Sequence, residues 1–283
     1  MQKYTDFSRK EVRSLVYGKV KPKLNTQHPK PILVKFIGII PARYASTRFP
    51  GKPLAMINGK SMIMRVYEQA MKAGCFQEVV VATDDQRIFD HVIDKGGKVL
   101  MTSAHHPSGT DRVFEAVSQL IPDQNGLKEH VIINIQGDEP FIDPKAIITL
   151  SESFKNTEVN IASLIKKINS QEELLDRNVV KVIIGKSKRA LYFSRSPLPH
   201  LRGIELSDWL SDYSFFKHVG IYAYRAEILK EIAALPISFL EQAEGLEQLR
   251  WLDNGYAIHM EVTDYESISI DTPGDLSKIT NKV

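Results

Sequence analysis

The chain has 283 residues, of which 43% are hydrophobic and 25% are charged. This composition predicts a soluble globular protein with one large domain or two smaller ones. A single cysteine, Cys75, excludes an internal disulfide framework, and no apolar run approaches the roughly 18 residues of a membrane span. We therefore expect a cytoplasmic protein without membrane insertion.

The net charge of +3 is unevenly distributed. Residues 1–30 contain eight Lys or Arg and two Asp or Glu, which gives +6, so the remainder of the chain carries −3. The overall charge is therefore no argument for a nucleic-acid partner.

Residues 1–33 are predicted to form a basic, disordered N-terminal extension, because they lack apolar periodicity and contain no signal-peptide core. A transit peptide, a tether to an anionic surface, an expression leader and a wrongly extended start remain alternatives. Val34 stands where an initiator would fit, and we expect a native start there at a non-AUG codon. Residues 34–283 are predicted to form a single domain.

The first half of this domain alternates between strand-like and helix-like segments. Strands are predicted at 36–40, 78–82, 98–101 and 131–135, and helices at 61–74, 88–95 and 109–120. The run 131–135 is almost continuously apolar, which is typical of a central parallel strand. The alternation predicts an α/β fold with a Rossmann-like, doubly wound, mostly parallel sheet.

The second half is richer in strand-like segments. Strands are predicted at 159–168, 179–184, 190–194, 218–224, 258–262 and 267–270, and helices at about 226–234 and 246–252. We interpret residues 155–225 as a smaller β-rich lobe inserted in the domain.

Residues 41–53 form an unusually long connection after the first predicted strand. About twenty residues separate that strand from the next helix, whereas such connections usually take about 2–6. The connection carries Arg43, Arg48 and Lys52 among small residues and glycine, a combination that suits a polyphosphate. The alternative is a solvated basic loop.

Two aspartates follow predicted strands and are candidates for a metal site. Asp138 comes directly after 131–135, although a turn aspartate before a proline is the alternative. Asp271 precedes a helix that Thr272 and Asp275 are placed to cap, so Asp271 is not needed as the cap. Ligands of open α/β sheets bind at the carboxyl ends of strands, where two carboxylates would hold Mg²⁺ against phosphate.

Three further motifs do not match the known binding sites that they partly resemble. Gly59-Lys60-Ser61 lacks the glycine that a Walker A loop needs at position 54, and no Gly-x-Gly-x-x-Gly follows the first strand. His105 and His106 have no Cys or carboxylate at the ligand spacing of a zinc site.

These features together resemble the 3-deoxy-manno-octulosonate cytidylyltransferases, also called CMP-Kdo synthetases. Blocks similar to that family occur in the family's order from residue 34 to the end of the chain. They are residues 39–53, 82–84, 108–112, 136–140, 192–195, 218–222, 246–250 and 271–273. Phe49 and Gly274 depart from the commoner family residues, and neither is a proposed ligand.

The resemblance implies that CTP and Kdo give CMP-Kdo and pyrophosphate, with Mg²⁺ as cofactor, for lipopolysaccharide synthesis by a homodimer. It assigns catalysis and triphosphate binding to Arg43, Arg48 and Lys52, with Asp138 and Asp271 as catalytic metal ligands. It assigns cytosine recognition to Ala42, Ser108 and Gln136, and the acidic sugar to Arg195, His218, Tyr222, Glu247 and Gln248. Without the resemblance, Arg195 would be interpreted as a surface arginine and His218 as a core histidine.

Three alternatives stay open. The same chemistry could act on 8-amino-Kdo or another acidic sugar, although residues 41–48 argue against sialic acid. A non-catalytic nucleotide-binding protein could use the same fold. A glycosyltransferase could also look similar, but it would consume a nucleotide-sugar and release no pyrophosphate.

Overall fold

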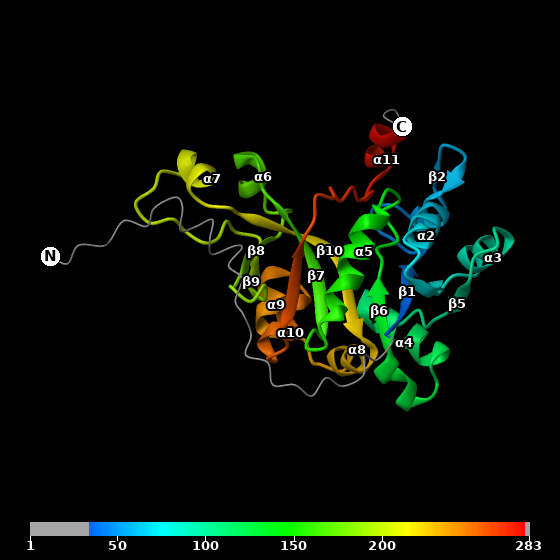
Figure 1. Cartoon of the computed structure of the whole chain (residues 1–283). Coiled ribbons are helices and arrows are strands. Elements are labelled where there is room, and N and C mark those ends of the chain that lie inside the picture. The colour runs from blue at the N-terminus through cyan, green and yellow to red at the C-terminus, as the bar shows by residue number, and fades with distance from the viewer. Residues whose placement is uncertain (1–33, 281–283) are drawn as a thin grey trace.

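The computed structural model describes residues 34–280. The predictions for the N-terminal extension, residues 1–33, lie outside the described residues, as do the last three residues of the chain. Figure 1 shows a twisted sheet with helices packed along it. The strands of the main sheet are β1 (Lys35–Ala42), β4 (Phe76–Thr83), β5 (Val99–Met101), β6 (His130–Asn134), β7 (Ile161–Lys167), β8 (Lys181–Ile184), β9 (Ala190–Ser194), β10 (Phe216–Arg225) and β11 (Ile258–Val262).

The sheet is mostly parallel, as predicted. Its strand order is β11-β7-β10-β6-β1-β4-β5, with β8 and β9 attached beside β10. Along this order β10 alone runs antiparallel to its neighbours β6 and β7, and the other neighbouring pairs are parallel. The predicted central strand is therefore β6, with β1 parallel on one side and β10 antiparallel on the other.

The predicted helices begin and end close to the predicted positions, and the structure contains further helices. They are α2 (Met62–Lys72), α3 (Gln86–Asp94), α4 (Gly109–Leu120), α5 (Pro144–Glu152), α6 (Gln171–Leu175), α7 (Trp209–Asp212), α8 (Ala226–Ala233), α9 (Phe239–Glu244), α10 (Gln248–Asp253) and α11 (Pro273–Thr280). The sequence analysis did not predict α5, α6, α7 or α9. The shorter elements are the hairpin β2 (Met56–Ile57) and β3 (Lys60–Ser61) and the 3-10 turns Lys52–Leu54, Gln124–Glu129, Ser153–Lys155 and Leu206–Asp208.

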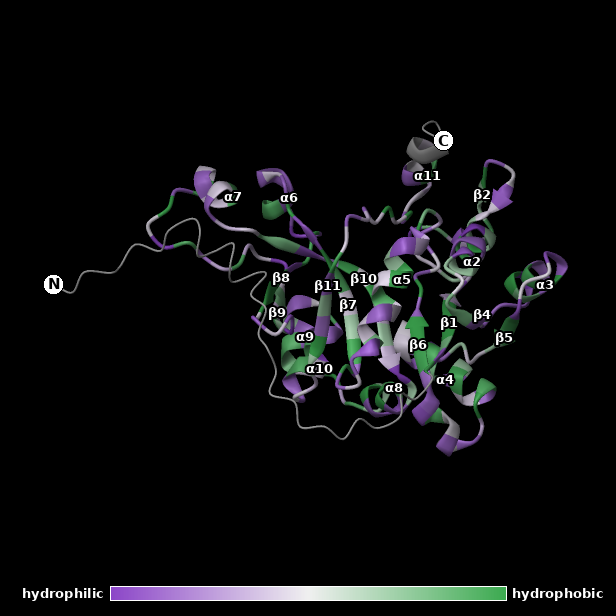
Figure 2. Cartoon of the chain, viewed as in Figure 1, coloured by the Kyte–Doolittle hydropathy of each residue, from purple (hydrophilic) through white to green (hydrophobic). Residues whose placement is uncertain are grey.

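Two apolar layers cover opposite faces of the sheet. Successive strand residues point to opposite faces: Ile40 and Val81 pack with α2, α3 and α5, whereas Ile39 and Val80 pack with α4, α8 and α10. In Figure 2 the strands of the sheet are largely green and the exposed turns largely purple. This double covering confirms the doubly wound arrangement, because a strand buried on both faces needs apolar residues at nearly every position.

Two of the predicted features need correction. The segment predicted as a β-rich lobe, residues 155–225, is divided: β7 and β10 belong to the centre of the main sheet, while α6, α7, β8 and β9 extend to the left in Figure 1. The strand predicted at 267–270 is absent, since residues 263–270 have no regular secondary structure. We call residues 263–270, which connect β11 to α11, the strap.

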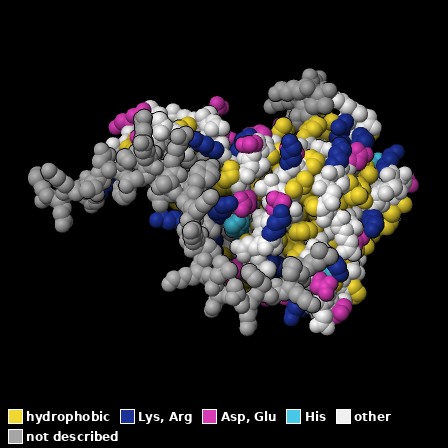
Figure 3. Space-filling model, in the orientation of Figure 1, with side chains coloured by type: hydrophobic (Ala, Val, Ile, Leu, Met, Phe, Trp, Pro, Cys, Tyr) yellow, Lys and Arg dark blue, Asp and Glu magenta, His cyan; other side chains and the backbone are white. Residues whose placement is uncertain are grey.

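The surface charges in the view of Figure 3 are mixed in sign. Blue and magenta side chains both occur on the coloured part of that face, between yellow apolar areas. Within residues 34–280, no helix is both long enough and apolar enough to span a bilayer.

Candidate active site

The basic connection after β1 has the length that the sequence predicts, and it folds back on itself. Gly51 adopts φ 71° and its amide donates to the Tyr44 carbonyl at 2.9 Å. This left-handed conformation favours glycine, and a Cβ there would lie 3.1 Å from the Tyr44 ring. The turn places Lys52 at the start of a 3-10 turn, and Ser61 then occupies the N-cap position of α2 without a capping hydrogen bond from its side chain.

A second close approach brings Asp138 to the same edge of the sheet. Residues 136–138 follow β6, and a Cβ on Gly137 would lie 2.7 Å from the Pro41 carbonyl oxygen. Only glycine allows these two backbones to come so close. Asp138 is consequently held beside the end of β1, where the basic connection begins.

Four of the predicted residues meet in one group of ion pairs, which we call the charge cluster. Lys52 Nζ lies 2.7 Å from Asp138 Oδ2 and 3.3 Å from Asp271 Oδ1. Arg48 lies 3.2 Å from the same Asp271 oxygen. The cluster comprises Arg48, Lys52, Asp138 and Asp271. A lysine ammonium bridging two carboxylates shows that the space between them accepts a positive charge.

The strap, and not a strand, delivers Asp271 to this cluster. The amide of Ile270 donates to the Asp138 carbonyl at 3.0 Å, and the Ile270 side chain is fully buried. After Asp271 the capping box forms as predicted, because Thr272 Oγ1 accepts from the Asp275 amide at 3.2 Å and the Asp275 carboxylate accepts from the Thr272 amide at 2.9 Å. Asp271 is therefore free of a capping role.

Arg43 and Ser108 lie together, but at the start of α4. Arg43 donates to the carbonyls of His106 at 2.6 Å and Ser108 at 3.3 Å. Ser108 caps α4 reciprocally with Asp111. Ala42, at the end of β1, is 3% exposed. These contacts form a second polar group next to the amino end of a helix, where backbone amides and the helix dipole favour an anion.

Gln136 connects this side of the sheet to β10. Its Nε2 donates to the Gly220 carbonyl at 3.1 Å. Pairing of β10 with β7 is irregular between Val219 and Tyr222, which is a bulge. Residues four apart on a regular strand are separated by about 13 Å, yet the rings of His218 and Tyr222 are 5.1 Å apart between centroids. The bulge thus re-aims two of the predicted sugar residues.

Other side chains pack closely around these two rings, so that Tyr222 is buried and His218 is partly exposed at the surface. The Phe193 ring lies 5.3 Å from His218, and Ser163 Oγ lies 2.8 Å from His218 Nε2. Burial lowers the pKa of His218 to about 3 and raises the pKa of Tyr222. His218 is therefore neutral at physiological pH. The Oη of Tyr222 is buried and has no hydrogen-bond partner within the described part of the chain, which leaves it available to a ligand.

Glu247 and Gln248 come from the start of α10 and face the same region. Thr110 Oγ1, on α4, donates to Glu247 Oε2 at 3.0 Å, and burial raises the pKa of Glu247. The Glu247 charge also contributes to the raised pKa of Tyr222. Gln248 is 6% exposed. We call the set His218, Tyr222, Glu247 and Gln248 the β10–α10 cluster.

Arg195 lies beside the segment that leads to Glu247. Its guanidinium donates to the carbonyls of Glu244 at 2.7 Å, Arg177 at 3.1 Å and Gly245 at 3.4 Å. Its amide donates to the Glu244 carboxylate at 2.9 Å. The carbonyls that hold this guanidinium are neutral, so they do not compensate its positive charge. The guanidinium can therefore still attract an anion.

Sequence reasoning missed one buried ion pair and one buried carboxyl near the site. Arg112, fully buried on α4, donates to Asp84 at 2.6 Å, and burial lowers the pKa of Arg112. Glu139 is 4% exposed next to Asp138, and burial raises the pKa of its carboxyl. Asp84, Arg112 and Glu139 stand within the blocks that carry the family resemblance, which was the signal available for them.

The described residues contain no group of three or more His, Cys, Asp or Glu placed to hold a metal ion. His106, one of the two adjacent histidines, contacts Glu115. A cation at Asp138 and Asp271 would take its remaining ligands from substrate oxygens or water, which is typical of Mg²⁺.

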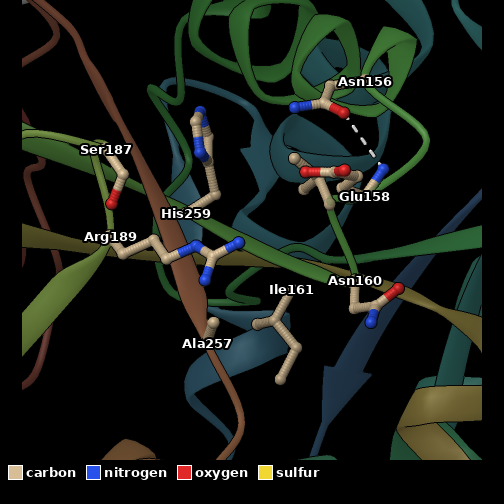
Figure 4. Close-up of a pocket in the computed structure, with 9 residues that line it drawn as sticks. Asn156, Glu158, Asn160, Ile161, Ser187, Arg189, Ala257 and His259 are labelled. Carbon is tan, nitrogen blue, oxygen red and sulfur yellow. Dashed lines mark hydrogen bonds between the residues drawn. The ribbon is translucent and has the colours of Figure 1, made fainter. Parts of the chain in front are cut away.

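A polar pocket at the other end of the sheet is excluded from the site. Figure 4 shows Arg189 and His259 in this pocket, with Asn156 and Glu158 on its far side. It is formed where β7 and β11 begin, beside Ile161 and Ala257. The candidate site lies at the opposite, carboxyl ends of the parallel strands, where ligands of such sheets bind.

Comparison with known proteins is consistent with this geometry. The family model described as "Cytidylyltransferase" matches residues 37–263. A 3-deoxy-manno-octulosonate cytidylyltransferase of Parabacteroides distasonis is 52% identical over 250 residues, covering 87% of this chain and 97% of that protein. The enzyme of the same name from Bacteroides thetaiotaomicron is 52% identical over 246 residues, covering 86% and 96%.

Solved structures agree in fold. A CMP:2-keto-3-deoxy-manno-octonic acid synthetase complexed with CTP superposes with a TM-score of 0.79 at 41% identity, over 88% of this chain and 98% of that one. A 4-diphosphocytidyl-2C-methyl-D-erythritol synthase from Anaerococcus prevotii superposes with a TM-score of 0.55 at 14% identity, over 88% and 98%. The latter similarity shows the fold alone.

Proposed function

The chain belongs to the cytidylyltransferase family, and on that premise we propose that it activates Kdo with CTP, giving CMP-Kdo and pyrophosphate for lipopolysaccharide synthesis. The observation that carries this proposal is the charge cluster, in which Lys52 bridges Asp138 and Asp271 at the carboxyl ends of the strands. The fold and the relatives named 3-deoxy-manno-octulosonate cytidylyltransferase support the same reaction.

In this reaction the charge cluster receives the triphosphate. Lys52 and Arg48 are paired with carboxylates, and the phosphate oxygens of CTP offer these cations stronger partners. Asp138 and Asp271 supply carboxylate oxygens that fit Mg²⁺, and a bound Mg²⁺ would neutralise phosphate charge and lower the pKa of a bound hydroxyl. Nucleotidyl transfer needs positioning and charge neutralisation more than it needs a protein nucleophile.

The nucleotide base is assigned to the other polar group of the site. Ala42 ends β1, Ser108 precedes α4 and contacts Arg43, and Gln136 follows β6. Arg43 itself is assigned to the triphosphate with Arg48 and Lys52. The backbone groups of Ala42 and Ser108 and the amide of Gln136 offer donors and acceptors that suit the edge of a cytosine.

The β10–α10 cluster and Arg195 are assigned to the acidic sugar. Arg195 suits bidentate capture of the Kdo carboxylate. Glu247, Gln248 and the unpartnered Oη of Tyr222 suit the sugar hydroxyls. The anomeric hydroxyl of the sugar gives up its proton to solvent, and its oxygen forms the new bond to the α-phosphorus of CTP. The bond between the α-phosphorus and the oxygen that bridges to the β-phosphate breaks, and pyrophosphate leaves with that electron pair.

Pyrophosphate release tests the proposal. The purified protein is incubated with CTP and Mg²⁺ together with Kdo, with 8-amino-Kdo or with no sugar. We expect release that depends on Kdo and stops when EDTA removes the metal. A preference for 8-amino-Kdo would keep the chemistry and change the substrate. CTP binding by calorimetry without release from either sugar would contradict the proposed activity and favour a non-catalytic nucleotide-binding protein.

We also propose that the enzyme is a cytoplasmic homodimer. Large apolar side chains are exposed on β9 and around α9, where Leu191 is 61% and Phe239 80% exposed, and such side chains are common in interfaces between subunits. The partly buried, unpaired Cys75 and a dependence on CTP suit a reducing cytoplasm. Light scattering that gives the mass of a monomer would contradict the dimer.

A further inference from the structure

The two carboxylates of the proposed metal site follow segments that differ in how their backbones are hydrogen-bonded. Asp138 follows β6, a strand hydrogen-bonded on both sides within the sheet. Asp271 follows the strap, residues 263–270, which has no strand ladder to position it. Metal affinity depends on the distance between the ligands, and that distance depends on where the strap places Asp271. Since no strand pairing fixes the strap, other contacts must hold it in position.

One backbone contact is the Ile270 amide, which donates to the Asp138 carbonyl at 3.0 Å, and Glu139 supplies two side-chain contacts. Its Oε2 accepts from the Tyr265 hydroxyl at 3.0 Å and its Oε1 accepts from the Ser267 hydroxyl at 2.7 Å. Both donors belong to the strap, and Glu139 is adjacent to Asp138 in the chain. Each oxygen of one buried carboxyl is therefore used to hold the segment that ends in Asp271.

The other side of the strap is held to the sheet by charges. The carboxylate of Glu266 pairs with Lys166 on β7 at 2.6 Å and also contacts Lys217 on β10. Glu266 is about half exposed, so these ion pairs contribute little. The contact of Glu139 with Tyr265 is buried and its contact with Ser267 is partly buried. The loss of a partner there leaves an oxygen of the buried Glu139 carboxyl unsatisfied, which costs more.

We propose that Glu139 is a positioning residue that sets the separation of Asp138 and Asp271 through Tyr265 and Ser267. This inference rests on the proposed function, because it concerns the metal that the two aspartates would hold. Residues that orient metal ligands typically change metal affinity by about 10–100-fold when they are replaced. Glu139 touches neither aspartate carboxylate in the contacts above, so it acts through the strap.

The test measures metal binding without turnover. Mn²⁺ is titrated into protein saturated with CTP in the absence of sugar, and free Mn²⁺ is followed by electron paramagnetic resonance. We expect Tyr265→Phe and Ser267→Ala each to weaken Mn²⁺ binding by about tenfold, while the affinity for CTP in EDTA stays at the wild-type value. High Mg²⁺ should restore the turnover of both variants.

Tyr256→Phe is the matched control. The Tyr256 hydroxyl also donates to a glutamate, Glu231, at 2.8 Å, but this hydrogen bond lies on the surface and away from the strap. We expect wild-type Mn²⁺ binding in this variant. Glu139→Gln keeps the shape and one acceptor oxygen, so its Mn²⁺ affinity should lie between those of the wild type and Tyr265→Phe.

The outcomes separate the two proposals. Unchanged Mn²⁺ affinity in both Tyr265→Phe and Ser267→Ala would overturn the role of Glu139 and leave the proposed activity standing. If Tyr265→Phe does not fold, Ser267→Ala decides alone. Failure of the wild-type protein to bind Mn²⁺ with CTP would overturn the metal site itself, and the positioning role with it.

Discussion

The charge cluster and the β10–α10 cluster lie at one edge of the sheet, but they differ in exposure and in the interactions that hold their side chains. Side chains of the charge cluster are between 16% and 66% exposed, and ion pairs hold them together. The β10–α10 cluster is shielded by aromatic rings. Burial lowers the pKa of His218 and raises the pKa values of Tyr222 and Glu247, and each shift favours the neutral form of the side chain. One region can therefore exchange its ionic partners when substrate arrives, and the other presents a preformed surface.

This difference makes the mutational consequences distinct. Changes in the charge cluster should act on the rate of chemistry, because charge develops on the phosphates in the transition state. Changes in or beside the β10–α10 cluster should act on the affinity for the sugar. The following experiments test that division in order of expected effect.

Asp138→Asn should lower turnover the most. We expect a loss of about 10²–10⁴-fold, or roughly 3–5 kcal/mol of transition-state stabilisation, because the neutral amide is a poor metal ligand. Turnover is measured at saturating CTP, Kdo and Mg²⁺. Asp94→Asn, at the exposed end of α3, is the control. Wild-type activity in Asp138→Asn would sink the assignment of this residue.

Lys52→Met should lower turnover by about 10²–10³-fold through the loss of a phosphate-binding cation. The same change leaves Asp138 and Asp271 facing each other without the ammonium that lies 2.7 and 3.3 Å from them. Mg²⁺ alone should therefore raise the melting temperature of this variant more than that of the wild type. Equal stabilisation by Mg²⁺ in the two proteins would argue against a metal between these carboxylates.

Arg195→Ala should mainly raise the KM for the sugar, by about 10–100-fold, since a charge-assisted hydrogen bond is worth about 1.5–3 kcal/mol. The KM for CTP should hardly change. Arg189→Ala is the matched control, because Arg189 lines the pocket of Figure 4 at the opposite end of the sheet. An unchanged sugar KM in Arg195→Ala would count against the assigned role.

The smallest effect concerns the dependence of stability on pH through His218. Its pKa in the folded protein is about 3, below the ordinary value of 6.5, so the unfolded chain binds the extra proton between these values. Acid therefore lowers the free energy of unfolding as the pH falls from 6.5 toward 3. Urea unfolding of the wild type and His218→Gln at pH 7 and pH 5 should show a larger loss for the wild type. Parallel losses would contradict the low pKa.

Much of the charge cluster is predictable from the sequence, because strand ends and unusual loop length are local signals. Lys52 and Asp138 each follow an apolar run that is typical of a strand. Parallel strands bring their carboxyl ends to the same edge of the sheet, so the two residues are expected at that edge. The fold class follows from the same alternation of strands and helices. These predictions depended on periodicity, which the chain displays clearly.

The strap shows why the remainder was not predictable. Ser267-Ile268-Ser269-Ile270 alternates like a strand, yet Ile270 is fully buried while Ile268 is 43% exposed. The segment finds no neighbouring strand and is held by side-chain hydrogen bonds to Glu139 instead. Such long-range side-chain partners leave no periodic pattern, and the bulge in β10 that joins His218 to Tyr222 is similarly invisible in the sequence.

The Lys52–Asp271 ion pair joins residues 219 positions apart. During synthesis on the ribosome, the sheet from β1 to β6 can form long before Asp271 is made, since domains fold from the N-terminal side as the chain emerges. Until then Lys52 can pair with Asp138 alone. The charge cluster is thus assembled from segments that are synthesised at widely separated times, and it is complete only after the strap has joined the sheet.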